Sequence, residues 1–177
     1  MALKVGINGF GRIGRMVLRS IIENNRKDLE IVAINNRGNS EVSSFLLKHD
    51  TIHGKLKAKI NHSEKAIEIN GKKISMIHET EISKIDWNKH KVDIVLECTG
   101  KFNSKKQSLV HITNGARKVL ISAPADGVDK TIVYGVNHET LLPTDKIVSN
   151  ASCTTNCLAP IAKIPVSYTH LTLPTKR

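Results

Sequence analysis

The sequence predicts an α/β fold built on a doubly wound, mostly parallel β-sheet. Short apolar runs rich in Val and Ile alternate along the chain with segments whose apolar residues recur at helical spacing. These runs are mostly apolar and do not alternate strictly with polar residues, which is typical of parallel strands buried on both faces of a sheet. At 177 residues the chain has room for one sizeable core, or for one domain and a piece of another.

The first fifty residues supply the opening elements. Residues 4–8 form a short apolar run that stops at a glycine, and residues 12–25 carry apolar side chains at helical spacing. Residues 29–35 are a second strand of the buried type, so this segment predicts one βαβ unit of about thirty residues. Residues 41–48 predict a short helix.

A hairpin interrupts the alternation before it resumes. Residues 58–77 alternate in polarity around Asn70-Gly71, a dipeptide that strongly favours a hairpin turn. Further strands are predicted at residues 92–97, 118–122 and 131–136, with a helix at 105–113. A last strand at 147–150 would deliver the chain to Ser152 and Cys153.

The composition argues against several function classes. Hydrophobic residues make up 40% of the chain, and no apolar run approaches the roughly 18 residues that a membrane span needs. The formal net charge of +11 would suit a nucleic-acid partner, but the basic residues are scattered and only 3% of residues are aromatic. We therefore expect no membrane association and no dedicated nucleic-acid partner.

The cysteines and histidines indicate the compartment and the metal content. Three cysteines without a regular framework fit reduced thiols, and the N-terminus lacks the layout of a secretory signal, so we expect a cytoplasmic location. His49 and His53 have a helical spacing that could suit a metal, but a surface turn is the better interpretation. We expect no metal site.

The segment Gly9-Phe-Gly11-Arg-Ile-Gly14 has the spacing G-x-G-x-x-G. It follows a predicted strand and opens a predicted helix, which is the context that a dinucleotide-binding turn requires. The first glycine permits the tight turn, the second lets a pyrophosphate approach the backbone, and the third lets helix and strand pack closely. The N–H groups at the helix N-terminus favour the phosphates, so we expect a Rossmann-type domain that binds NAD or NADP.

The end of the second strand bears on the choice between these cofactors. An NAD-binding fold usually places an acidic residue there to accept hydrogen bonds from the adenosine ribose. This chain has Asn35, Asn36 and Arg37 instead. A neutral Asn does not repel a 2′-phosphate and an Arg could attract one, so both cofactors stay open.

The segment SNASCTTNC places Cys153 among small and hydroxylated residues. If a helix begins after the last strand, this thiol lies at its N-terminus, where the helix dipole and nearby N–H donors favour the thiolate. Ser152, Thr154 and Thr155 would add donors around a phosphate or a developing oxyanion. We interpret Cys98 and Cys157 as structural thiols, with Cys157 buried.

Five segments together resemble the glyceraldehyde-3-phosphate dehydrogenase family: KVGINGFGRIGR, KHDTIHGK, ISAP, YGVNHE and SNASCTTNCLAP. The resemblance runs from about residue 4 to residue 164. It implies a cytoplasmic enzyme of glycolysis and glucose metabolism that forms homotetramers as a full-length chain. It also implies that glyceraldehyde 3-phosphate is oxidised to 1,3-bisphosphoglycerate with NAD or NADP and inorganic phosphate.

The resemblance assigns roles to matching positions. Cys153 corresponds to the nucleophile that forms a thiohemiacetal and then a thioester, and Ser152 and Thr154 correspond to ligands of the phosphate groups. Arg12 and Ile13 match cofactor contacts, as do Thr99 and Ser122, which the resemblance places beside the nicotinamide half.

Two positions depart from the family pattern. Asn36 stands where relatives that use NAD typically carry Asp, and Thr80 stands where many relatives carry Arg near the adenine. Both remain cofactor-binding candidates, and both leave the preference between NAD and NADP open.

The resemblance also implies a domain division. We expect an NAD(P)-binding domain at residues 1–150 and the start of a truncated catalytic domain at 151–164. The family's catalytic histidine would lie beyond residue 164, so we expect the fragment alone to be inactive. Residues 165–177 form an expected non-native tail, because VSYTHLTLPTKR matches the translation of a transposase adapter used in sequencing libraries.

Two other functions stay open at this point. Erythrose-4-phosphate dehydrogenase shares the cysteine motif, and residues of the substrate domain would distinguish it from a glyceraldehyde-3-phosphate dehydrogenase. The chain could also be a cofactor-binding module without activity, which would retain the cofactor and oxidise no aldehyde.

Overall fold

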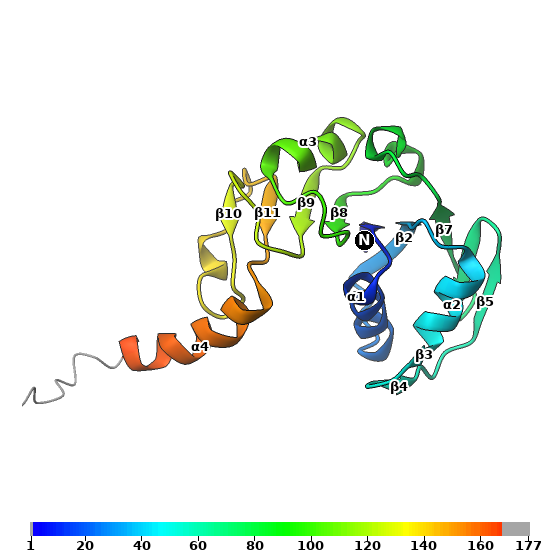
Figure 1. Ribbon diagram of the computed structural model, residues 1–177, viewed down its shortest axis with the longest axis horizontal. Coiled ribbons are helices and arrows are strands. Elements are labelled where there is room, and N and C mark those ends of the chain that lie inside the picture. The colour runs from blue at the N-terminus through cyan, green and yellow to red at the C-terminus, as the bar shows by residue number, and fades with distance from the viewer. Residues whose placement is uncertain (1, 168–177) are drawn as a thin grey trace, which may run out of the picture.

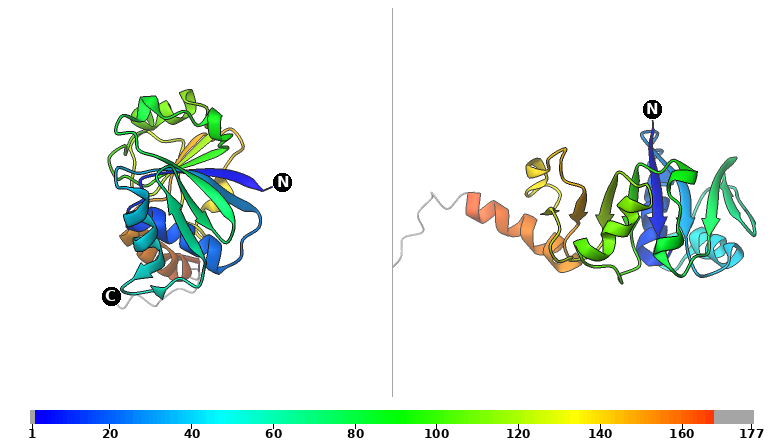
Figure 2. Two further views of the ribbon diagram at one scale, coloured as in Figure 1. Left: turned by 90° about the vertical axis from the view of Figure 1, so that its right-hand side faces the viewer. Right: turned by 90° about the horizontal axis from the view of Figure 1, so that it is seen from above.

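The computed structural model describes residues 2–167 and shows a nine-stranded, mostly parallel sheet with helices on both faces (Figures 1 and 2). Its strands are β1 (Leu3–Asn8), β2 (Leu29–Asn35), β5 (Ile60–Ser63), β6 (Ala66–Ile69), β7 (Lys72–Ile77), β8 (Ile94–Glu97), β9 (Lys118–Ile121), β10 (Lys130–Thr131) and β11 (Ile147–Ser149). They follow the order β10-β11-β9-β8-β1-β2-β7-β6-β5. The doubly wound, Rossmann-type fold expected from the sequence is confirmed.

The order reverses at β1, which pairs in parallel with β2 on one side and with β8 on the other. Only β5, β6 and β7 are joined in antiparallel fashion, and they form one end of the sheet. In open α/β sheets the crevice at such a reversal, outside the carboxyl ends of the strands, is the usual ligand site.

Helices α1 (Arg12–Glu23) and α2 (Ser40–Lys48) cover one face of the sheet, and α3 (Lys105–Thr113) covers the other (Figure 2, left). Helix α4 (Cys153–Ser167) follows β11 and extends away from the sheet (Figure 1). The remaining described elements are a two-stranded ribbon of β3 (His49–Asp50) and β4 (Gly54–Lys55), and the 3-10 turns η1 (Ile82–Lys84), η2 (Asn88–His90) and η3 (His138–Thr140).

Two main cores lie on opposite sides of the sheet. On the α1 side, Ile7 and Ile34 are fully buried and pack with Leu18 of the helix. On the α3 side, Trp87 is fully buried beside Val95. The glycine at position 6 in β1 makes room for this indole, since a Cβ there would lie 2.8 Å from Trp87 Cζ3.

The predicted elements agree with the structure in most places. The predicted strand 29–35 and helix 105–113 have the observed bounds of β2 and α3. The Asn70-Gly71 turn connects β6 to β7, as predicted, and residue 70 has the left-handed φ of 51° that such turns require. A second antiparallel pair, β5 with β6, completes that end of the sheet.

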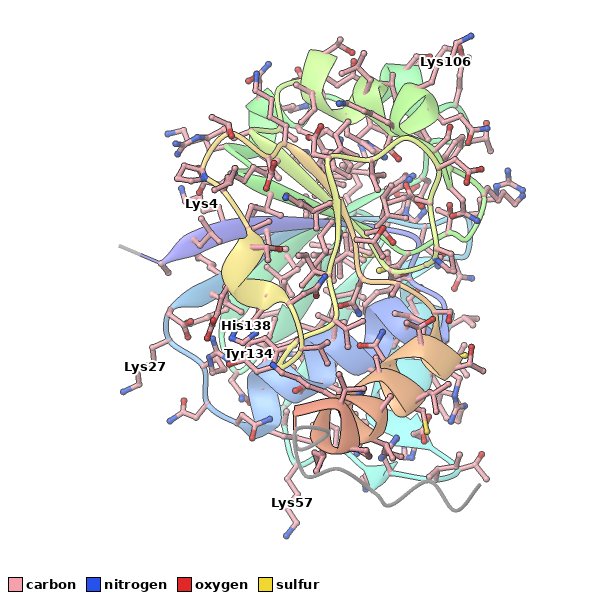
Figure 3. All side chains as sticks on the ribbon, turned by 90° about the vertical axis from the view of Figure 1, so that its left-hand side faces the viewer. Lys4, Lys27, Lys57, Lys106, Tyr134 and His138 are labelled. Atoms are coloured by element: carbon pink, nitrogen blue, oxygen red, sulfur yellow. The ribbon has the colours of Figure 1, made fainter. Side chains whose placement is uncertain are left out.

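The predicted strand at 131–136 is wrong beyond residue 131. The side chain of Asn137 accepts a hydrogen bond from the Val133 N–H and donates one to the Thr131 carbonyl, so it closes a turn where a ladder would continue. The exposed Tyr134 ring stacks on His138, with ring centroids 4.5 Å apart, and Figure 3 shows the two side chains together.

The expected domain division is not tested by the fold. Helix α4 continues without interruption from residue 153 through residue 167, so the boundary expected at residue 165 falls inside it. The remainder of the expected tail, residues 168–177, lies outside the described residues.

The basic residues are spread over the surface. In Figure 3, Lys106 lies at the top of the molecule, Lys57 at the bottom, and Lys4 and Lys27 on the left side, apart from each other. In the part of the chain that the structure describes, no helix is both long and apolar enough to traverse a bilayer.

Candidate active site

A cavity of about 230 Å³ lies at the carboxyl ends of β1, β2 and β8, and we call it the strand-end cavity. It is lined by Asn8, Gly9, Gly11, Asn35, Asn36, Arg37, Glu79, Thr80, Ile82, Cys98, Thr99, Lys101 and Phe102. This is the crevice that the reversal of strand order predicts, and it contains two of the three motif glycines.

The backbone conformation and surroundings of the three motif glycines agree with the roles that the sequence predicts for them. Gly9 has φ of +95°, and a Cβ on it would lie 2.7 Å from the Thr99 backbone nitrogen. A Cβ on Gly14 would lie 2.3 Å from the Gly9 carbonyl oxygen, so this glycine lets α1 pack closely against the turn. A Cβ on Gly11 would meet none of the described atoms within 4 Å, so the backbone there is open to a ligand.

Asn36 and Arg37, which follow β2, and Thr80, which follows β7, line the same cavity. The Asn36 backbone N–H donates to the Ile77 carbonyl at 2.9 Å, which fixes the residue beside β7. Its side-chain amide donates to the Ser43 hydroxyl at 3.1 Å.

Arg12 lines neither the strand-end cavity nor the larger hollow beside Cys153. Its guanidinium is half exposed and 3.9 Å from the Asp50 carboxylate. The next basic residue, Arg15, donates to the Phe10 carbonyl at 3.0 Å and so holds the glycine turn from inside. Burial lowers the pKa of Arg15 from its ordinary value.

A second, larger hollow of about 940 Å³ runs between α1, the sheet and the start of α4, and we call it the cysteine cleft. Ile13, Ser122, Ser152 and Cys153 line it, so the structure brings together four of the predicted site residues. Thr99 is not among them, because it lines the strand-end cavity. Cys98 lines both hollows and marks where they adjoin.

Cys153 is the first residue of α4, as predicted, and it is exposed. Ser152 caps this helix, because its hydroxyl oxygen accepts a hydrogen bond from the Thr155 N–H at 2.9 Å. The Ser152 hydroxyl also contacts the hydroxyl oxygens of Thr154 at 2.9 Å and of Thr155 at 2.6 Å. The N–H groups of Cys153 and Thr154 belong to the first turn, which has no preceding carbonyl in the helix to bind them.

The residue before the cap is held in an unusual conformation. Ala151 is buried and has φ of 56°, a left-handed conformation that a residue with a Cβ adopts at a cost of about 1–2 kcal/mol. Its N–H donates to the Ser149 hydroxyl at 3.0 Å, and that hydroxyl donates to the Ala123 carbonyl at 2.7 Å. These bonds anchor the bend that turns β11 into α4.

The other two thiols differ from Cys153 and from each other. Cys98 is partly buried, and burial raises its pKa to about 11, although a hydrogen bond with Ser122 acts in the opposite direction. It is therefore the less reactive type of thiol that the sequence predicted. The prediction that Cys157 is buried is wrong, because it is exposed on α4.

Among residues 2–167 there is no group of three or more His, Cys, Asp or Glu side chains placed to hold a metal ion. Residues that the sequence analysis did not assign to the site also line the strand-end cavity, among them Glu79, Lys101 and Phe102. Each follows the end of a strand of the sheet, and that position alone could have suggested them.

Comparison with known proteins agrees with this geometry. A family model described as "Glyceraldehyde 3-phosphate dehydrogenase, NAD binding domain" matches residues 3–105, which include the glycine turn, Asn36, Thr80 and Thr99. The chain belongs to the glyceraldehyde-3-phosphate dehydrogenase family. The resemblance inferred from five sequence segments is thereby confirmed.

Relatives with the name glyceraldehyde-3-phosphate dehydrogenase extend the match. The protein of Cereibacter sphaeroides is 49% identical over 164 residues, which are 93% of this chain and 49% of the relative. That of Zymomonas mobilis subsp. mobilis is 50% identical over 165 residues, and that of Pseudomonas aeruginosa 46% identical over 165, with the same shares covered. The chain spans about half the length of the curated relatives that it matches.

Proposed function

We propose that this chain forms the cofactor-binding part, with the nucleophile, of a phosphorylating glyceraldehyde-3-phosphate dehydrogenase. The whole protein would oxidise glyceraldehyde 3-phosphate to 1,3-bisphosphoglycerate. The observation that best supports this is the adjacency of the two hollows: the glycine turn borders one, Cys153 borders the other, and Cys98 lines both.

The residues of the strand-end cavity fit a dinucleotide. Gly11 leaves its backbone open to a pyrophosphate, and the N-terminus of α1 offers N–H groups beside it. Asn36, Arg37 and Thr80 would hold the adenosine part, and Ile13, which is 51% exposed in the cysteine cleft, would face the nicotinamide ring. When bound, the dinucleotide supplies a hydride acceptor.

Cys153 would act first, as a thiolate that attacks the aldehyde carbon. A carbon–sulfur bond forms as the carbonyl π bond breaks, and the negative charge moves from the sulfur to the former carbonyl oxygen of the thiohemiacetal. The N–H groups of Cys153 and Thr154 would stabilise this oxygen, and the Ser152 and Thr154 hydroxyls would bind phosphate. Loss of a hydride from the carbon leaves a thioester, and inorganic phosphate breaks its carbon–sulfur bond to release the acyl phosphate and the thiolate.

The activity can be tested by completing the chain. Residues 1–164 would be joined to the second half of the Cereibacter sphaeroides relative, and formation of reduced cofactor would be followed spectroscopically. We expect oxidation of glyceraldehyde 3-phosphate that depends on inorganic phosphate. Cys153→Ser should abolish it while leaving cofactor binding intact, and Cys157→Ser, on the same helix, is the matched control.

Two outcomes would count against the proposal. Turnover by the Cys153→Ser form would contradict the assignment of the nucleophile. Cofactor binding without any oxidation by the completed chain would favour a binding module without activity.

The remaining assignments are proposals as well. NAD is the cofactor of the matched family domain, and we propose that the chain accepts NAD or NADP because Asn36 and Arg37 do not exclude a 2′-phosphate. We also propose a homotetramer for the full-length protein and a cytoplasmic location.

A further inference from the structure

A continuous chain of buried polar side chains lies beneath the strand-end cavity, and nothing in the proposed chemistry uses it. It runs from Asn35 through Asn8, Glu97 and His111 to Trp87, and we call it the buried chain. Four of these five side chains are no more than 1% exposed, and Asn35 is 6% exposed. Asn8 and Asn35 also line the cavity, so the chain connects the cavity with the core under α3.

Backbone groups fix the direction of the hydrogen bonds at the cavity end. The Glu79 N–H donates to Asn35 Oδ1 at 3.0 Å, which identifies the amide oxygen of Asn35. The Asn35 amide nitrogen then donates to Asn8 Oδ1 at 2.8 Å. Asn8 is thereby left to donate through its own amide nitrogen to Glu97 Oε2, at 2.6 Å.

The tryptophan fixes the direction at the other end. An indole N–H can only donate, so Nδ1 of His111, 3.1 Å from Trp87 Nε1, must accept. The imidazole proton is then on Nε2, which donates to Glu97 Oε2 at 2.9 Å. The hydrogen bonds from both ends of the buried chain therefore donate to the same oxygen, Oε2 of Glu97.

The second oxygen of Glu97 is bound by the cavity wall. Glu97 Oε1 accepts a hydrogen bond from the Thr99 N–H at 2.8 Å and another from the Thr99 hydroxyl. All four bonds donate to the carboxyl group, so each of its oxygens accepts two hydrogen bonds. Among the described residues, no lysine or arginine forms an ion pair with Glu97, so these hydrogen bonds satisfy its buried carboxyl group.

The bonds to Glu97 set the shape of the cavity. The Thr99 hydroxyl donates its proton to Glu97. The hydroxyl oxygen in turn accepts a hydrogen bond from the Lys101 N–H at 3.1 Å, which orders the turn after Thr99. Since the Gly9 backbone packs directly on the Thr99 backbone, the position of Thr99 also limits where the glycine turn can lie. An apolar pair could fill the same volume without a buried charge, but it could not hold Asn8 and Thr99 by hydrogen bonds.

We propose that Glu97 is a positioning residue of the dinucleotide site, and that the buried chain transmits occupancy of that site to Trp87. The carboxylate orients Asn8 and Thr99 at the ends of β1 and β8, and His111 carries any shift of the carboxylate to the indole. The inference rests on the proposed function, because it assumes that the strand-end cavity binds a dinucleotide.

Trp87 is the only tryptophan of the chain, so its indole N–H gives one resonance in a ¹H–¹⁵N correlation spectrum. NAD would be titrated into the chain while this resonance and the amides of Gly11 and Thr99 are followed. We expect the indole, which is not part of the cavity lining, to shift with the same midpoint as the two amides. If the buried chain had a purely structural role, the indole resonance would not shift during the titration.

The variant Glu97→Gln keeps the size of the side chain but cannot accept four hydrogen bonds. We expect about tenfold weaker NAD binding or more, and an indole resonance that no longer follows the titration. The matched control is Glu30→Gln, the same substitution at an exposed position of β2, which should bind NAD like the parent chain. If Glu97→Gln does not fold, the parent titration alone still decides whether the indole responds.

The outcomes separate this inference from the proposed function. If the Gly11 and Thr99 amides respond to NAD while the indole does not, or if Glu97→Gln binds as tightly as Glu30→Gln, the inference is overturned and the proposed function stands. If none of the cavity resonances responds, the proposed function is contradicted and the inference falls with it.

Discussion

The strand-end cavity and the cysteine cleft adjoin, but they are built differently. In the cavity, polar side chains bind one another and the backbone, and the charge of Glu97 is held by four hydrogen bonds beneath the wall. In the cleft, apolar side chains such as Val17, Leu96 and Leu120 line a much larger hollow, and the nucleophile candidate is exposed at one end. The two hollows therefore differ in their support: hydrogen bonds within this chain hold the wall of the strand-end cavity, whereas the thiol lies on an open surface.

The largest expected difference between the two regions is in thiol reactivity. At pH 8, Cys98, with a pKa of about 11, has roughly one thiolate in a thousand, whereas an ordinary exposed thiol has about one in four. We expect iodoacetamide to alkylate Cys153 at least about a hundredfold faster than Cys98. Mass spectrometry of peptides separates these sites from the exposed Cys157.

The pH dependence supplies the control for this prediction. Labelling of Cys98 in the folded chain should rise about tenfold for each pH unit between pH 8 and pH 10, because the thiolate fraction does so below the pKa. Equal rates at Cys98 and Cys153 would show that the two environments do not differ as described.

The glycine turn offers a second way to test the comparison. Gly14→Ala would press a Cβ to 2.3 Å from the Gly9 carbonyl oxygen, and we expect it to destabilise the fold by about 2 kcal/mol. Gly11→Ala meets open space and should change the free energy of unfolding by less than about 1 kcal/mol, while it weakens dinucleotide binding. Urea unfolding and NAD titration of both variants would check this, and a reversed pattern would contradict the roles given to the two glycines.

Cofactor preference tests the adenosine end of the cavity. Asn36→Asp introduces a carboxylate that accepts from ribose hydroxyls and repels a 2′-phosphate, so the ratio of NAD to NADP affinity should rise by about tenfold. Calorimetric titration with each cofactor measures the ratio. Asn61→Asp, at an exposed position of β5 outside the cavity lining, is the control. An unchanged ratio in the Asn36→Asp chain would mean that this position does not face the ribose.

The smallest expected effect concerns the support of β11, the strand that leads to Cys153. The Lys105 ammonium and the N–H groups of Ile147 and Lys146 hold the pKa of Asp129 at about 2, below its ordinary value of 3.8. The resulting stabilisation is present above about pH 4 and is lost as the pH falls through the pKa of the folded state. Asp129→Asn should therefore cost about 1 kcal/mol at pH 6 and less at pH 3.

Urea unfolding of parent and variant at both pH values measures this dependence. A cost that is equal at the two pH values would show that the charge of Asp129 does not contribute.

Local patterns predicted the parts of the fold that local chemistry determines. The glycine spacing predicted the turn of Gly9 and the close packing of Gly14, and Asn70-Gly71 predicted a hairpin connection. The strand predicted before Ser152 and the residues around Cys153 predicted a thiol at a helix N-terminus. In each case the information lies within a few neighbouring residues.

The features that the sequence did not predict depend on contacts between distant residues. Asn137 ends the expected strand at 131–136 through its side chain, and residue type alone does not show whether an Asn will do so. Cys157 has an apolar neighbour at Leu158, yet both are exposed because α4 extends away from the sheet. The bond between Glu97 and His111 joins positions 14 residues apart, which only the packing of α3 on β8 brings together.

The most direct test of the account compares two ligands in one titration series. Under the account, NAD shifts the amides of Gly11 in the cavity and of Cys153 at the start of α4 with a single dissociation constant, whereas ADP, which lacks the nicotinamide half, shifts Gly11 alone. A Cys153 amide that stays unaffected while NAD saturates the cavity would contradict the claim that one dinucleotide spans both hollows.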